Sequence, residues 1–273
     1  MYMETFEPSL ADLQKITSST EVSSKALTLE RQCTMAQVLA ARRAIKIEEN
    51  GESLRPIPND LFSLAQPHLY LQAGAPYGGA SPFFLREGVV ERLIDAQQAL
   101  QREMPHHRFH IFDGFRPQAV QVYMRQFDYD KFAREEGLEP TNLTPAQDQN
   151  MWDRVNLLWA QPSTDPLKPP PPHSTGAALD VTIVDPSGQP LSMGSDFDEA
   201  SARILPSYYA EQAEFEAVTV CVNRELLNRV MTGVGFHRIT HEWWHFSYGD
   251  QMWALLESLK TCRDISAIYG EVT

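Results

Sequence analysis

Two short segments of this sequence carry side chains that could together hold a catalytic metal ion. The first runs from His173 to Asp180, and the second runs from Glu242 to His245. Between them they offer two imidazoles, one carboxylate ligand and one further carboxylate. A catalytic zinc site uses three protein ligands and an open position for water, with a base near that water. The pattern therefore predicts a metallohydrolase with one zinc ion per chain, held by His173, Asp180 and His245.

The first segment is expected to bring a loop histidine close to a strand aspartate. Gly176 allows the tight backbone turn that this approach requires. Residues 178–184 alternate in polarity, which predicts a strand whose Asp180 points away from the apolar face. A histidine followed by an aspartate is usually structural when it stands alone. An unpaired carboxylate in such an apolar strand would be costly, however, and a metal ion would neutralise it.

The second segment also matches a rival zinc pattern. His241 and His245 flank Glu242 as in the HExxH motif, in which both histidines bind zinc from one helix. The residues around them are β-branched or aromatic and end in glycine, which favours a strand over residues 239–248. We therefore expect His245 to be the ligand and His241 a bystander. In a regular strand Glu242 and His245 would face opposite ways, so a bulge or the end of the strand must bring them together.

Two further residues have both an ordinary and a functional interpretation. Arg116 follows Asp113 at the start of a predicted helix, where a salt bridge is the ordinary role. As a fixed, charged fork it could instead stabilise an oxyanion, which is typically worth about 3–4 kcal/mol of barrier. Asp198 lies among several acids of a loop and could be a solvated turn residue. Near a metal, its carboxylate could hold the ammonium group of a substrate.

Hydrophobic periodicity predicts the elements that must position these residues. Helices are expected over residues 29–49, 87–104, 117–135, 146–160, 214–232 and 251–260, and strands over 108–112, 178–184 and 239–248. Residues 66–82 are rich in glycine, proline and alanine and are expected to form a loop. Residues 161–172 include six prolines and are expected to be extended polyproline II, either as a linker or as a stiff wall beside His173.

The composition limits the classes of function. The 273 residues are 42% hydrophobic, enough for a sizeable core, and the net charge of −13 argues against a nucleic-acid partner. Three cysteines are too few for a disulfide framework. Residues 1–10 lack the apolar stretch of a signal peptide, and no run approaches the about 18 apolar residues of a membrane span. We therefore expect a cytoplasmic protein without a membrane span.

Four segments, taken in order, resemble the D-alanyl-D-alanine dipeptidases, which are zinc peptidases that act on cell-wall peptides. These segments are Asp113–Pro117, His173–Asp180, Met193–Asp198 and Gly235–Phe236 followed by Glu242–Phe246. Each segment is weak evidence alone, but the ordered set is specific, and it covers about residues 87–248. The zinc ligands that the family pattern implies are the three named above, which disfavours the HExxH interpretation.

The resemblance also implies roles for the other residues. Glu242 would be the general base that activates water and then protonates the leaving amine, and Arg116 would stabilise the oxyanion. Asp198 would bind the free amino group of a dipeptide. The sequence departs from the family at Pro171, where a serine that contacts substrate usually stands. Either Tyr70 or Tyr77 is expected to stand in for the family's substrate-binding tyrosine.

We thus expect an α+β fold with a small central antiparallel sheet flanked by helices. Residues 1–60 would form a helical N-terminal extension, and residues 61–273 the catalytic domain. The expected partner is a small peptide, with D-Ala-D-Ala as the preferred substrate. One alternative is a D,D- or L,D-carboxypeptidase that acts on longer peptidoglycan stems. Another is a non-catalytic cell-wall or metal-binding protein, although Glu242 and Arg116 argue against a mere binder.

Overall fold

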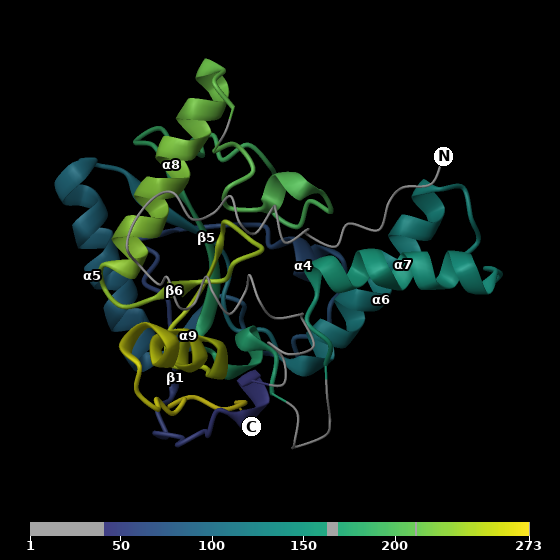
Figure 1. The fold of residues 1–273 in the computed structure, drawn as a ribbon, viewed down its shortest axis with the longest axis horizontal. Coiled ribbons are helices and arrows are strands. Elements are labelled where there is room, and N and C mark those ends of the chain that lie inside the picture. The colour runs from purple at the N-terminus through teal and green to yellow at the C-terminus, as the bar shows by residue number, and fades with distance from the viewer. Residues whose placement is uncertain (1–40, 163–168, 211, 273) are drawn as a thin grey trace.

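The computed structural model describes residues 41–162, 169–210 and 212–272 (Figure 1). Most of the helix expected over 29–49 therefore lies outside the described residues, as does the centre of the proline-rich segment. Within the described part, residues 41–44 are helical but 45–49 are not, so that end of the prediction is wrong. The backbone is extended there because Ile47 forms an isolated β-bridge with Ala267. The amide of Glu48 also donates to the Ala267 carbonyl at 2.7 Å.

The central sheet has five strands in the order β2-β4-β5-β7-β6. The strands are β2 (Ser63–Leu64), β4 (Arg108–Asp113), β5 (Ala178–Val184), β6 (His237–Arg238) and β7 (His245–Ser247). Only the edge pair β2–β4 is parallel, and the other described pairs of this sheet are antiparallel. A separate antiparallel pair joins β1 (Leu54–Pro56) to β3 (Phe84–Arg86). The predicted α+β class with a small, mainly antiparallel sheet is thus confirmed.

Helices pack around this sheet. They are α4 (Leu69–Gln72), α5 (Glu87–Glu103), α6 (Gln118–Glu135), α7 (Pro145–Leu158), α8 (Phe215–Thr232) and α9 (Gln251–Thr261), with 3-10 turns η2 (Pro172–Thr175) and η3 (Ala202–Ile204). The five helices predicted after residue 80 are confirmed to within two residues at each end, and α4 is a short helix inside the predicted loop. The ends follow local chemistry, since Thr144 and Gln147 form a capping box at α7 and Asp250 caps α9.

Apolar side chains form two cores. The main core joins α5 and α8 to one face of β5, through residues such as Leu93, Val181 and Leu227. The second core joins α6 and α7 to Phe112 of β4. Figure 1 shows α5 with α8 on one side of β5 and α6 with α7 on the other. Phe197 packs against both cores, so the two meet near the segment that carries Asp198.

The strand expected over residues 239–248 is a hairpin. β6 pairs with β7 in antiparallel register, and the amide of Ile239 donates to the His245 carbonyl at 3.0 Å. Residues 240–244 form the turn, which is held in place because the amide of Val181 donates to the carbonyl of Trp244 at 3.1 Å. The prediction was wrong in length because β-branched and aromatic residues suit both the strands and a buried turn. Glu242 therefore precedes the strand that begins at His245.

The described part of the predicted N-terminal extension, residues 41–60, packs on the rest of the chain. Arg86 on β3 donates from Nη1 to the carbonyl of Glu52, and the hydroxyl of Tyr269 donates to the Glu52 carboxylate at 2.7 Å. Because residues 1–40 lie outside the description, the domain division at residue 60 stays a prediction. Among the described residues, no helix has both the length and the apolarity to cross a membrane.

The segment after β7 turns at Gly249, whose carbonyl accepts hydrogen bonds from the amides of Ile268 and Tyr269 near the C-terminus. Gly249 has a φ of +83°, and a Cβ there would lie 2.6 Å from the ring of Tyr269, which is 1% exposed. Gly188 has a similar φ of +86°, but a Cβ added to it would have no atom within 4 Å. The two glycines thus share a left-handed backbone that would strain any other residue, and they differ in the space around them.

Replacing Gly249 with alanine should therefore destabilise the fold more than replacing Gly188. The left-handed backbone should lower the free energy of unfolding by about 1–2 kcal/mol in Gly188→Ala. Gly249→Ala should lose about 1–3 kcal/mol more through its clash with the buried ring. Urea unfolding of both variants measures the difference, and equal losses would show that this end of β7 has more room than the structure gives it.

Candidate metal centre

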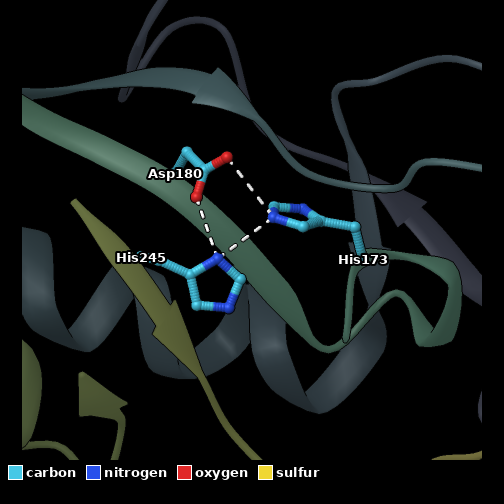
Figure 2. A group of neighbouring side chains, drawn as sticks. All are labelled: His173, Asp180 and His245. Carbon is cyan, nitrogen blue, oxygen red and sulfur yellow. Dashed lines mark hydrogen bonds and ion pairs between the residues drawn. The ribbon is translucent and has the colours of Figure 1, made fainter. Parts of the chain in front are cut away.

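Three elements bring His173, Asp180 and His245 together, as Figure 2 shows. His173 lies in η2, Asp180 in β5, and His245 begins β7 as the register partner of Asp180. The Nε2 atom of His173 lies 3.2 Å from Nδ1 of His245 and 3.3 Å from Oδ2 of Asp180. The Nδ1 atom of His245 lies 3.1 Å from Oδ1 of Asp180. All three side chains are buried, and one ligand atom of each lies within 4.8 Å of the others.

The turn that carries His173 is held by its own side chains. The hydroxyls of Ser174 and Thr175 donate to the carbonyls of Pro171 and Pro172, at 2.9 and 2.6 Å. Gly176 ends the turn with a φ of +69°, as the sequence predicted for a tight reversal into β5. The Pro171 position therefore contributes its carbonyl to the turn.

The donor set fits a metal cation. The Nδ1 of His173 lies 2.7 Å from the carbonyl of Gly114, which can only accept, so Nδ1 carries the proton and the Nε2 lone pair faces the centre. Two imidazole nitrogens and a carboxylate oxygen around one point are a common ligand set for zinc and related ions. Burial opposes ionisation of Asp180, but the charges and hydrogen bonds of His173 and His245 outweigh it and hold its pKa well below the usual range. The group can therefore hold a metal.

Glu242 is the acid placed beside this group. Its Oε2 lies 3.9 Å from Nδ1 of His245, and its side chain is 10% exposed. Because Glu242 sits in the turn before β7, it does not have to face away from His245 as it would in a regular strand. Burial, together with the charges of Asp180 and Asp198, raises the pKa of Glu242 well above its usual value. A bound cation beside Glu242 would oppose this shift, and the position of its carboxyl group next to His245 is suited to proton transfer.

The HExxH interpretation does not match this geometry. His241 lies in the same turn as Glu242, and residues 240–244 are not helical, so His241 and His245 do not share a helix face. His241 is 30% exposed, and its Nε2 lies 3.9 Å from Oε1 of Glu242. Among the described residues, the group that could hold a metal contains His245 and not His241.

Arg116 is buried at the edge of the centre. Its Nη2 lies 3.5 Å from Oδ2 of Asp180 and 2.7 Å from Oδ2 of Asp113, to which Nε also donates at 2.8 Å. Its Nη1 donates to the amide oxygen of Gln121 at 3.0 Å, and its guanidinium lies 4.7 Å from the ring of Trp159. The salt bridge of the ordinary interpretation is therefore present, and it holds the guanidinium beside Asp180.

Asp198 and Tyr70 form the other wall of the centre. The hydroxyl of Tyr70 donates to Oδ2 of Asp198 at 2.6 Å and lies 3.5 Å from Nη2 of Arg116. Asp198 has a φ of +55°, in the left-handed region where aspartate is enriched among L residues, and the hydrogen bond from Tyr70 positions its carboxylate. Burial raises the pKa of Asp198 to about 6 despite the hydrogen bond from Tyr70.

Several supporting residues were not singled out from the sequence. Of the two tyrosines weighed, the structure places Tyr70 against Asp198, whereas the hydroxyl of Tyr77 lies 3.4 Å from Asp113. Gln121 and Trp159 have no sequence signal beyond ordinary helix positions. Their contacts with Arg116 exist only because α6 and the end of α7 pack together.

The comparisons with known proteins agree with one another. The family described as D-Ala-D-Ala dipeptidase matches residues 64–262. A D-alanyl-D-alanine dipeptidase of Synechocystis is 45% identical over 219 residues, which cover 77% of this chain and 87% of that protein. The protein of the same name from Escherichia coli is 43% identical over 74 residues, 27% of this chain and 36% of its own length. That of Enterococcus faecalis is 27% identical over 142 residues, 52% and 62% of the two chains.

The raised pKa of Asp198 predicts a stability change in the metal-free protein. Because its pKa is about 6 in the folded state and lower when unfolded, wild-type stability should fall as pH rises from about 4 to about 6. Asp198→Asn removes this loss, so above pH 6 the variant should be more stable by on the order of 1 kcal/mol. Denaturant unfolding between pH 4 and 8 after chelation measures it, with Asp196→Asn in the same loop as control. A variant that is less stable at every pH would contradict the burial of this carboxylate.

Proposed function

The chain belongs to the D-Ala-D-Ala dipeptidase family and is a metallopeptidase, and on this premise we propose that it hydrolyses D-Ala-D-Ala to two D-alanines with one zinc ion. The proposal rests on one observation: the side chains suited to the four chemical roles of such an enzyme lie close together. The ligand group contacts Glu242 and Arg116 directly, and the carboxylate of Asp198 joins this set of contacts through the hydroxyl of Tyr70.

His173, Asp180 and His245 would hold the metal. When bound, a zinc ion would polarise the scissile carbonyl and lower the pKa of a water molecule towards about 7. Glu242 would take the proton of the attacking water and deliver it to the nitrogen of the leaving D-alanine. Its burial beside His245 keeps the carboxylate near the reacting atoms and away from bulk water.

Arg116 and Asp198 would each stabilise one charge, the negative charge on the carbonyl oxygen and the positive charge on the substrate's amino group. The guanidinium of Arg116 is fixed by Asp113 and Gln121 before substrate arrives, so little reorganisation is needed when negative charge grows on the carbonyl oxygen. Asp198 would bind the free ammonium group of the dipeptide, with Tyr70 orienting its carboxylate. A substrate without that ammonium would leave the Asp198 carboxylate unpaired, which favours a dipeptide over a blocked peptide.

The role of Glu242 predicts a loss of rate without a loss of metal. Glu242→Gln keeps the size of the side chain and removes its ability to accept a proton, so kcat for D-Ala-D-Ala should fall by about 10²–10⁴-fold. The measurement is D-alanine release by wild type and variant, with zinc content determined on both proteins. Full activity in a zinc-loaded Glu242→Gln variant would remove Glu242 from the mechanism, and a zinc-loaded wild type that releases no D-alanine would refute the substrate.

A further inference from the structure

A large cavity lies along the same face of β5 as the metal-binding group. It measures about 1250 Å³, and Thr182 lines it. Alternate residues of a strand share a face, so Thr182 points to the same side of the sheet as Asp180. The Thr182 hydroxyl is buried and has no hydrogen-bond partner among the described residues. A polar group left so close to the site and the cavity suggests that the cavity can receive a polar ligand.

Two stacked aromatic rings stand at the border between this cavity and the centre. Phe112 and Phe197 lie face to face, with ring centroids 4.4 Å apart and planes inclined by 10°. Both line the cavity. On the side of the centre, the ring of Phe112 contacts the ring of Tyr70 at 5.9 Å, and Phe197 directly precedes Asp198. The two rings therefore line the cavity and also adjoin the Tyr70–Asp198 pair, Phe112 through its ring contact and Phe197 through the chain.

Phe197 is the more central of the two rings. Besides Phe112, it contacts the rings of Trp243 and Trp244, at 5.4 and 5.7 Å, next to Glu242. It also packs against both hydrophobic cores while remaining partly exposed. A peptide bound at Asp198 that extended towards the cavity would therefore meet this ring.

The charges around the cavity suit an amino terminus. The acidic residues Asp196, Glu214 and Glu216 are among those that line it. The lining cation Arg203 is paired with Glu199 at 2.8 Å, so its charge is locally balanced. The ammonium group of one additional residue would therefore find a favourable potential there.

We propose that Phe197, stacked on Phe112, sets the length of the substrate by closing the amine end of the site, and that the cavity behind it is a latent subsite for one further amino-terminal residue. This inference rests on the proposed function, because it concerns which peptides reach the same metal centre. It makes Phe197 a residue that determines specificity by excluding longer chains, with no part in the bond-breaking step.

The test compares kcat/KM for D-Ala-D-Ala and for Gly-D-Ala-D-Ala, both followed by D-alanine release. Wild type should strongly prefer the dipeptide. In Phe197→Ala the ratio of tripeptide to dipeptide kcat/KM should rise by about tenfold or more, as expected when a steric block is removed from a pocket. Phe112→Leu thins the same stack from β4 and should shift the ratio in the same direction. Phe215→Ala is the control, since Phe215 is 88% exposed at the start of α8.

The two hypotheses fail in different ways. In one outcome, wild type cleaves D-Ala-D-Ala while the ratio in Phe197→Ala and Phe112→Leu stays within twofold of wild type. That result refutes the role of Phe197 in setting substrate length and leaves the proposed dipeptidase activity intact. Equal cleavage of both peptides by wild type refutes that role as well. If zinc-loaded wild type cleaves neither peptide, the proposed function is refuted, and so is the role of Phe197 that rests on it. Circular dichroism of each variant verifies folding, and Phe197→Leu replaces the alanine variant if that one does not fold.

Discussion

The structure depends on the burial of one carboxylate between two imidazoles. Asp180 lies on the central strand, where a charged group without partners would cost several kcal/mol. His245 meets it across the β5–β7 pair, and the turn before β5 brings in His173. Removing any one of the three would leave the other two buried and poorly paired. The hairpin, the glycine turn and the strand register therefore serve a single requirement, which a bound cation would complete.

The two hydrophobic cores hold different parts of the site. The main core fixes β5 and β7, and with them the ligand group. The second core, around α6 and α7, fixes Arg116 through Gln121 and Trp159. The guanidinium thus reaches Asp180 from a separately packed part of the fold. Phe197 packs against both cores, so one side chain contributes both to their alignment and to the wall behind Asp198.

The sequence predicted well what local patterns decide, and less well what tertiary contacts decide. The long helices and β5 follow from periodicity, and residue types and spacing singled out the three side chains that the structure brings together. The strand over 239–248 was too long because its hairpin depends on contacts with β5 that periodicity does not contain. Tyr70 was only one of two candidates, since its pairing with Asp198 joins residues 128 positions apart. Gln121 carried no signal because its function is to hold Arg116.

The metal centre is tested most directly by anomalous diffraction at the zinc absorption edge, from crystals of the purified protein. We predict one strong peak per chain, with Nε2 of His173, Nδ1 of His245 and the carboxylate of Asp180 as its protein ligands, and with Glu242 beside it but not bound to it. A peak bound by His241 and His245, or zinc-saturated crystals without a peak at this group, would contradict the account.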